Sequence, residues 1–492
     1  MRLFRLALIL AAALTLAGCG AKDKAASGGA AKIVPASAPA YVTVDSNADS
    51  SQWGQIEKLL EKFPDGGEAI RFLRSSFEDD TKLDWERDVK PALGDEIDLV
   101  WLDFEGGGGN VVAVTKPKDR EKFKTAVTKA NASDESDDEL LVGEHEDWLV
   151  LSDAQAKIDR FKQQVPKGDS LADDSTYKDA VAELPSDALL TVFARGENLT
   201  SAFQKALGGI TGGSPFQLTP GERPEFVTAA LAAEDGGLHF VGRTRTEQEA
   251  NDQIQTYESK LLDDVPGDAL AFATFRGGDA LDKQLRQLQG DAGGEALKEF
   301  ERMLGVQLED VTGLFENEVA LYVRGGTPLP EFTLLLEAQD EVAAKKTIDG
   351  VLAKVSSTLP AEPCHEPPKQ AGVKTSCVEI GDFEVRTAAF DGKAVVTTGP
   401  KAIEEIRSGG PRLADDDAFK DARGSAGVPD KNGGFVWLDL EDGLPLVFGF
   451  ADLSGEEIPP QLRRNLEPLR SVVAWAERDG RTSSAELFLA ID

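Results

Sequence analysis

The sequence predicts an α+β fold made of two tandem homologous units, each a mainly antiparallel sheet with helices packed on one face. Three observations lead to this prediction. Strand-like and helix-like patterns alternate in short blocks, the turns between strands are too short for parallel crossovers, and two long stretches share motifs in the same order. A chain of 492 residues has room for two or three domains with cores of their own.

The repeated motifs define an internal duplication. Three pairs of segments match in the same order: residues 88–99 with 310–321, 171–180 with 413–422, and 223–236 with 467–480. We therefore predict an α+β repeat unit 1 over residues 33–263 and a repeat unit 2 over residues 264–492. The interval between the first two motifs is longer in unit 2, and its additional residues include Cys364 and Cys377.

Each unit opens with Val-Pro, a turn signal, followed by an alternating apolar strand. The opening strands are residues 40–44 and 269–275, and the same signature recurs near the end of each unit at residues 184–193 and 428–440. The first three copies lead into segments with helical spacing, at residues 53–63, 199–207 and 281–288.

The middle of each unit reads as two strands, a helix and a hairpin. In unit 1 these are strands 96–104 and 110–115, helix 118–130 and a hairpin within 140–151. In unit 2 they are strands 318–324 and 332–338, helix 340–355 and a hairpin within 385–398 that turns at Asp391-Gly392.

The first 18 residues have the pattern of a secretion signal. Arg2 and Arg5 precede an apolar run, residues 6–17, that is too short to span a membrane. The run ends in Leu-Ala-Gly-Cys, which resembles the lipobox of bacterial lipoproteins. The resemblance implies that residues 1–18 are a lipoprotein signal peptide and that Cys19 is the lipid attachment site; the alternative is a plain secretory signal. The small, polar residues 19–32 are predicted to be a flexible tether.

Cys364 and Cys377 are the two cysteines left after the lipobox. They lie 13 positions apart, and an extracytoplasmic compartment is oxidising, so we predict a disulfide bond between them. A metal site that also uses His365 and Glu366 is the alternative, but the spacing lacks the Cys-x-x-Cys pattern that zinc sites favour. We therefore expect no metal site.

The charge of the chain excludes several classes of partner. There are 53 Lys and Arg against 87 Asp and Glu, which gives a net charge of −34. Nucleic-acid binding needs clustered basic side chains, so we expect no nucleic-acid partner. Beside an anionic membrane, such an acidic protein stays soluble and is held off the surface.

Two kinds of acidic segment are candidates for binding sites. Residues 134–139 lack the alternating oxygen ligands of a calcium loop, so a solvated loop is the better interpretation. The pairs Asp173-Asp174 and Asp415-Asp416 precede helices at equivalent places in the two units, and we predict that they are helix caps.

No catalytic signature is found, and we expect no catalytic residues and no cofactor. The glycine-rich residues 105–110 lack the Lys-Ser/Thr of a phosphate loop and are predicted to join two strands. His145 falls at a strand turn, and His239 lies in a strand pattern typical of a half-buried structural histidine. A carboxylate pair brought together by folding remains an alternative.

Two apolar segments, residues 208–216 and 444–453, follow the closing strand of each unit. They are interpreted either as ordinary core or as an apolar lip that lines a cleft or faces a partner.

The lipobox, the Val34-Pro35 strand and the Asp88-Val89 segment with Gly94-Asp95-Glu96 together resemble a family of predicted bacterial lipoproteins of unknown function, frequent in actinobacteria. The resemblance implies an envelope protein and transfers no site residue.

Three functions stay open at this point. The first is a non-catalytic, lipid-anchored envelope protein that is attached to the membrane through Cys19 and binds an envelope protein or a small apolar ligand on the extracytoplasmic face. The second is a carrier of apolar or lipid cargo with a cavity between sheet and helices. The third is an extracytoplasmic hydrolase with a carboxylate pair.

Overall fold

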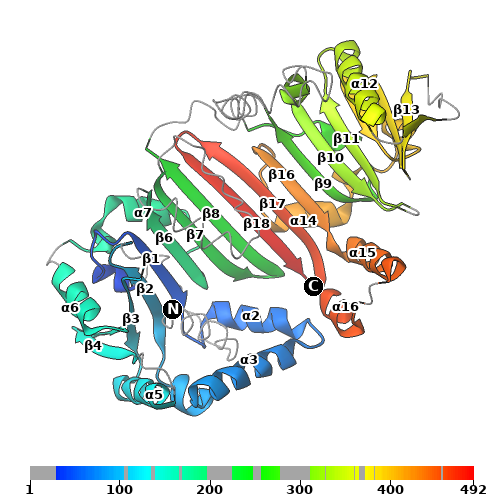
Figure 1. Ribbon diagram of the computed structural model, residues 1–492. Helices are drawn as coiled ribbons and strands as arrows, with labels where there is room; N and C mark the ends of the chain where they lie inside the picture. The colour runs from blue at the N-terminus through cyan, green and yellow to red at the C-terminus, as the bar shows by residue number, and fades with distance from the viewer. Residues whose placement is uncertain are drawn as a thin grey trace.

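The strands of this protein form one antiparallel sheet, which runs through the whole molecule (Figure 1). The structure is a computed structural model. It describes residues 29–104, 109–133, 139–165, 169–196, 224–247, 256–277, 311–326, 329–358, 361–364, 372–381, 383–455 and 458–492. The strands of these ranges make an 18-stranded sheet. The predicted α+β class is confirmed, but the expectation of a separate sheet in each unit is wrong. The strands β8 (Gly237–Thr246) and β18 (Thr482–Ile491) pair with each other and join the two halves.

The strands of the first half lie in the spatial order β4, β5, β3, β2, β1, β6, β7, β8. Their bounds are β1 (Ala40–Asp45), β2 (Gly94–Trp101), β3 (Val111–Pro117), β4 (Leu141–His145), β5 (Trp148–Ser152), β6 (Leu190–Arg195) and β7 (Pro224–Glu234). Apart from up to three residues at their ends, the strands of the central part match the segments predicted from alternation.

The second half has the same order, read from its outer edge as β14, β15, β11, β10, β9, β16, β17, β18. The bounds are β9 (Ala269–Arg276), β10 (Glu318–Arg324), β11 (Glu331–Glu337), β14 (Phe383–Phe390), β15 (Lys393–Thr397), β16 (Gly434–Asp439) and β17 (Leu469–Asp479). Two further strands, β12 (Ala361–Pro363) and β13 (Ser376–Ile380), extend this edge. They belong to the stretch that is longer in unit 2. The shared order supports the inferred duplication.

The duplicated motifs also make the same contact in both halves. The backbone N–H of Leu171 donates to the carbonyl of Val34 at 2.8 Å, and that of Leu413 donates to the carbonyl of Val265 at 2.9 Å. Each of these leucines begins a short 3-10 turn that leads into a helix. Asp174 Oδ1 accepts from Tyr177 N, and Asp416 Oδ1 accepts from Phe419 N, so the predicted caps are confirmed for these two aspartates.

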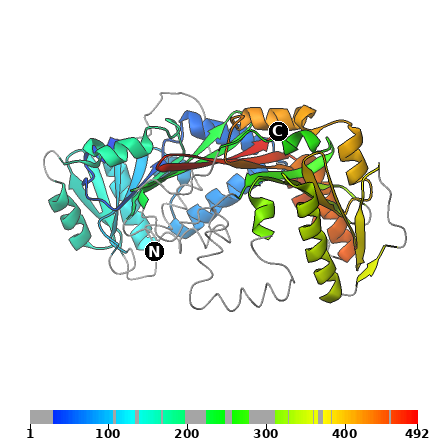
Figure 2. The ribbon, with the colours of Figure 1, turned by 90° about the horizontal axis from the view of Figure 1, so that it is seen from above.

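Helices cover both faces of the sheet, which corrects the prediction of helices on one face only (Figure 2). One side, here called the α5 face, carries α5 (Arg120–Ser133), α12 (Glu341–Thr358) and α15 (Leu440–Ser454). The other side carries α6 (Gln155–Gln164), α7 (Ser175–Val181), α13 (Ala402–Ser408) and α14 (Asp417–Ser425). Several strands, among them β2 and β3, carry apolar residues on both sides, as a sheet covered on both faces requires.

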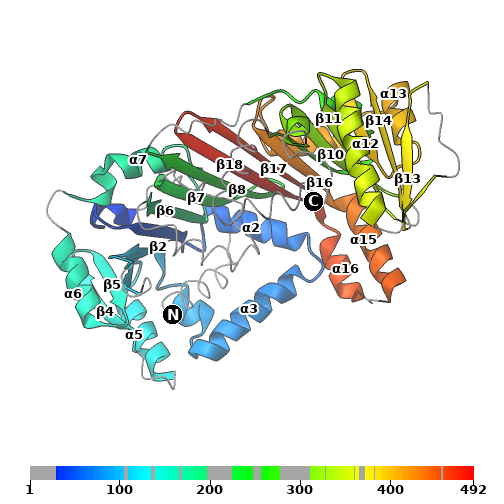
Figure 3. The same cartoon turned by 45° about the horizontal axis from the view of Figure 1, so that its top comes forward.

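Three other helices frame the α5 face at its rim. The helix α2 (Ser51–Glu61) packs against β7, and α3 (Gly66–Thr81) runs from α2 toward α5 (Figure 3). The turn between α2 and α3 reaches α16 (Pro460–Leu466) in the other half, where Asp65 N donates to Asn465 Oδ1 at 3.0 Å and Asn465 Nδ2 donates to Asp65 Oδ2 at 2.8 Å. Residues from both units therefore form this rim.

The folded body starts earlier than predicted. Residues 29–32 were assigned to the flexible tether, but they form a 3-10 turn, η1 (Gly29–Lys32), in which Ala30 and Ala31 are fully buried. The backbone N–H of Ala30 donates to Glu96 Oε1 at 2.8 Å. This contact with a distant strand is the reason that a segment of tether-like composition is folded.

Candidate functional site: an apolar pocket under α5

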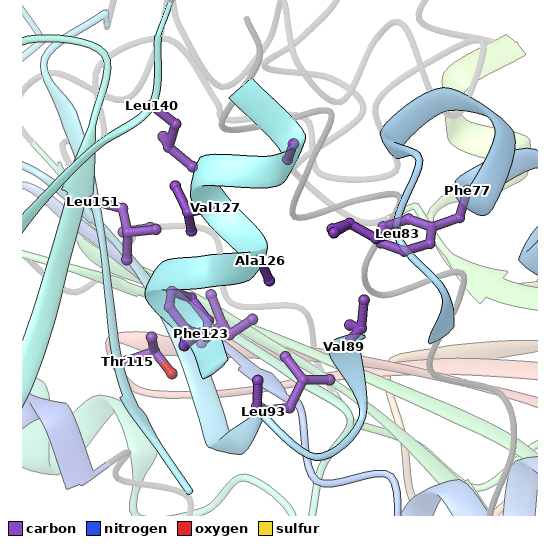
Figure 4. Close-up of a pocket in the computed structure, with 14 residues that line it drawn as sticks. Phe77, Leu83, Val89, Leu93, Thr115, Phe123, Ala126, Val127, Leu140 and Leu151 are labelled. Atoms are coloured by element: carbon purple, nitrogen blue, oxygen red, sulfur yellow. The ribbon is translucent and has the colours of Figure 1, made fainter. Parts of the chain in front are cut away.

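The clearest concave site lies between α5 and the sheet in the first half (Figure 4). Its floor comes from β2, β3 and β5, its roof from α5, and its side from the end of α3 and the short helix η2 (Trp85–Val89). The cavity has a volume of about 80 Å³. It is lined by Phe77, Leu83, Val89, Ala92, Leu93, Ile97, Ala113, Thr115, Phe123, Ala126, Val127, Ala130, Leu140 and Leu151.

The lining offers almost nothing to a polar ligand. Among the lining side chains Thr115 alone carries a polar atom, and its hydroxyl donates to the carbonyl of Glu96 at 2.7 Å. A water molecule needs two to four polar partners to be stable in a cavity, so this space favours hydrocarbon over water. Its chemistry is that of an apolar ligand site.

The pocket exists because α5 stands off the sheet. Phe123 and Val127 reach the apolar cluster of β2, β3 and β5, but no residue of α5 is fully buried. On the side that faces the pocket, α5 also carries the small side chains of Ala126 and Ala130, which leave the space below the helix unfilled. The corresponding helix in the second half, α12, buries Ala344 and Ile348 against Val319 and Leu336.

Polar contacts hold α5 over the pocket at three points. Lys129 Nζ lies 2.6 Å from Asp88 Oδ2 beside η2. Ser133 Oγ donates to the carbonyl of Thr81 at 2.9 Å, at the end of α3. Asn131 exchanges two hydrogen bonds with the backbone of Leu140, at 2.9 and 3.0 Å. These polar contacts hold α5 in place, while the apolar cavity beneath it stays unfilled.

The pKa of Asp88 is held well below its usual range. The main cause of this lowered pKa is the hydrogen bond from Arg87, and the second is the hydrogen bond from Lys129. Asp88 also accepts from the backbone N–H of Asp84 at 3.0 Å. The Asp88-Val89 motif found in the sequence therefore has a structural explanation: Asp88 anchors α5 to η2, and Val89 lines the pocket.

The residues singled out in the sequence lie elsewhere. Cys364 and Cys377 form a disulfide with a Cα–Cα distance of 5.6 Å, beside the edge strands β12 and β13. His145 ends β4 at a turn. His239 lies between two carboxylates, with Nδ1 2.8 Å from Glu234 and Nε2 2.9 Å from Glu486.

Other predicted sites fall outside the described residues: Cys19, residues 208–216, residues 105–108 and residues 134–138. The apolar residues 444–453 belong to the helix α15, in which Val447 is 57% exposed.

Buried carboxylates satisfy donors inside the fold. Glu96 and Asp98 are 8% and 0% exposed, and they accept from Ala30 N and from the hydroxyl of Tyr41 respectively. In the second half Glu318, at the position equivalent to Glu96, is fully buried. These side chains hold segments together, and none of them is part of the pocket lining.

Sequence reasoning missed the pocket. Its residues come from six separate elements, and the alanines of α5 have the spacing of any helix that covers a sheet. The sequence offered only the general expectation of a cavity between sheet and helices.

Among the described helices, none has both the length and the apolar character needed to cross a membrane. Fold and site together define a two-unit α+β protein with an apolar pocket. The chain belongs to the DUF3352 family, described as "Protein of unknown function", which matches residues 3–140 and 132–491. The predicted resemblance to a family of unknown function is confirmed at this level.

No curated protein matches the sequence. Among solved structures, crystal form IV of TP0453 is 14% identical, with 45% of this chain and 76% of that chain covered and a TM-score of 0.24. Crystal form I of TP0453 is 11% identical, with 48% and 92% covered and a TM-score of 0.24. Scores this low do not establish a common fold.

Proposed function

We propose that this protein is a non-catalytic, lipid-anchored binding protein on the extracytoplasmic face of the cell membrane, and that it binds an acyl chain whose end enters the pocket under α5. The observation that carries the proposal is the pocket itself: an apolar space whose only polar side chain, Thr115, is already satisfied within the sheet. It favours the carrier among the functions left open by the sequence.

Each methylene group that moves from water into an apolar site gains about 0.8 kcal/mol. An empty apolar cavity instead leaves its lining without contacts on one side. A hydrocarbon chain in the pocket is therefore stabilised both by leaving water and by its contacts with the lining. A polar ligand would lose its hydration without finding a hydrogen-bond partner.

The proposed location follows from the N-terminal segment. A lipid on Cys19 would anchor the protein, and the residues from there to Gly29, where the described fold begins, would keep the body close to the membrane. This position gives a carrier direct access to lipids.

Native mass spectrometry of the full chain with Cys19→Ser, which cannot be acylated, tests the proposal. After gentle purification we expect a population whose extra mass is released by organic solvent and identified as a fatty acid or lipid. The proposal is contradicted if the protein carries no such mass and also fails to bind palmitate added to it.

A further inference from the structure

The apolar floor of the pocket continues across the sheet into the second half. Residues that face each other on neighbouring strands point to the same side, so a paired series marks one face. One series on the α5 face, here called the apolar row, consists of Ile97, Val44, Leu190, Leu231, Phe240, Leu487, Ala474, Val436, Ala273, Leu321 and Leu334.

The apolar row starts inside the pocket, because Ile97 is part of its lining. It crosses the β8–β18 pair and ends on β11, ten strand spacings away, which is about 48 Å at the usual separation of paired strands. Every side chain along this path is aliphatic or aromatic. The row is therefore a continuous hydrocarbon surface shared by both units.

The part of the α5 face in the second half is exposed to an unusual degree. Six large apolar side chains on this side of the sheet are 37–45% exposed: Phe275, Leu321, Phe332, Val436, Leu438 and Leu487. They lie on β11, β10, β9, β16 and β18. The first four strands are neighbours, and β17, which carries Ala474 on the same face, separates β16 from β18. Contiguous apolar patches on a soluble protein mark binding surfaces.

Resting on the proposed function, we propose that the ligand is a lipid with more than one long acyl chain, a single molecule that spans both units. One chain enters the pocket under α5, and the remainder lies along the apolar row toward Val436 and Leu321. Continuity with the pocket favours lipid over a protein partner, since the row offers no hydrogen-bonding side chain that would specify a polypeptide.

The rim of the α5 face fits this occupant. The reciprocal hydrogen bonds between Asp65 and Asn465 connect the α2–α3 turn of the first half to α16 of the second. This link joins the first half to the second at the rim of the face on which the ligand would lie.

Binding of two probes to the full Cys19→Ser chain tests the inference: octanoate, a single short chain whose end enters the pocket and which is too short to follow the row to Val436, and dioleoyl phosphatidylcholine. The double substitution Val436→Asp/Leu487→Asp places charge on the row far from the pocket. We expect it to weaken binding of the phospholipid at least tenfold and to leave octanoate binding unchanged. Both side chains are already partly exposed, so the fold should tolerate the change. Leu462→Asp, on the exposed part of α16, is the matched control and should alter neither affinity.

The outcomes separate the two proposals. Unchanged phospholipid affinity in the double variant overturns this inference and leaves the pocket proposal standing. A shift of the native protein from dimer to monomer on the same substitution also overturns it, because the patch would then be covered by a second copy. The proposed function itself fails if neither probe binds the Cys19→Ser protein with an unchanged apolar row. It also fails if Ala126→Trp, which fills the pocket, leaves octanoate binding unchanged.

Discussion

Glu318 accepts a hydrogen bond from the backbone N–H of Leu261, which ties the segment before the opening strand of the second unit to β10. Glu96 makes the equivalent contact with Ala30 in the first unit. The same buried carboxylate thus fastens the start of each unit to its second strand. This repeated contact explains why the Gly-Asp-Glu and Glu-Asn-Glu segments align in the sequence.

The first prediction concerns Glu318. Its carboxylate also accepts from Lys260 N at 2.9 Å and from the hydroxyl of Thr274 at 3.1 Å. Glu318→Ala would remove the acceptor of the buried N–H of Leu261 and one hydrogen bond each from Lys260 N and Thr274, so we expect a loss of roughly 2–4 kcal/mol in the free energy of unfolding. Urea unfolding followed by tryptophan fluorescence measures it. The exposed Glu316→Ala is the control, and equal effects of the two substitutions would show that Glu318 does not hold this segment.

The second prediction concerns pH. Hydrogen bonds from His239 to Glu486 and to Glu234, with the Glu486 bond the larger cause, raise the pKa of His239. The folded state therefore favours the protonated ring. This stabilisation is fully present below the ordinary histidine pKa of about 6.5, and it is lost as pH rises through the raised pKa of the folded state.

Thermal unfolding from pH 5 to 9 checks this relation. The stability difference between the native protein and His239→Gln should shrink as pH increases, from a value on the order of 1 kcal/mol for a charge-assisted contact. His145→Gln is the control, because the ring of His145 contacts Phe161 rather than a carboxylate. A difference that grows with pH would have the wrong sign for this explanation.

The third prediction fills the pocket. Ala126→Leu adds apolar atoms to the unfilled space under α5, so we expect the protein to gain about 1–2 kcal/mol of stability and to lose affinity for octanoate about tenfold. Differential scanning calorimetry and probe titration measure the two effects. Thr128→Leu, at an exposed position of the same helix, should change neither. A destabilised Ala126→Leu that still binds octanoate would mean that the space is not a ligand site.

The fourth prediction concerns the disulfide. Replacing Cys364 and Cys377 by alanine removes a constraint on a short loop, which is worth about 3 kcal/mol in the chain-entropy model. We expect lower stability with unchanged octanoate affinity, because the disulfide lies at the far edge of the sheet from the pocket. Unfolding with and without reductant gives the same comparison for the native chain. No loss of stability would place the disulfide outside the cooperative fold.

The fifth prediction concerns the anchor. Cys19→Ser should release the protein from the membrane fraction into the medium and abolish incorporation of labelled palmitate. Cell fractionation and metabolic labelling measure both. Retention on the membrane without the label would show that something other than a lipid at Cys19 holds the protein there.

Local patterns in the sequence were enough for the strands that open each unit and fill its middle, for the caps at Asp174 and Asp416, and for the disulfide. Asp174 and Asp416 cap helices because the residues that need capping follow within three positions. The Asp391-Gly392 turn was predictable because both residues take the positive φ that a tight hairpin requires.

What the sequence could not provide depends on contacts between distant segments. The pairing of β8 with β18 was not predictable, because the alternation of apolar residues does not distinguish a strand at the edge of a sheet from one inside it. Ala30 and Ala31 resemble a linker until Glu96, 66 residues away from Ala30, binds their segment. The pocket depends on how far α5 stands from the sheet, which Ala126 and Ala130 alone do not reveal.

Photo-crosslinking tests the central claim most directly. Palmitate that carries a diazirine near the end of its chain is incubated with the full Cys19→Ser protein, irradiated, and the labelled peptides are sequenced by mass spectrometry. The proposal of an acyl chain in the pocket predicts labels on α5 and on the facing strands, at residues such as Phe123, Val127 and Ile97. Labels confined to other parts of the chain, or equal labelling of Ala126→Trp, would contradict it.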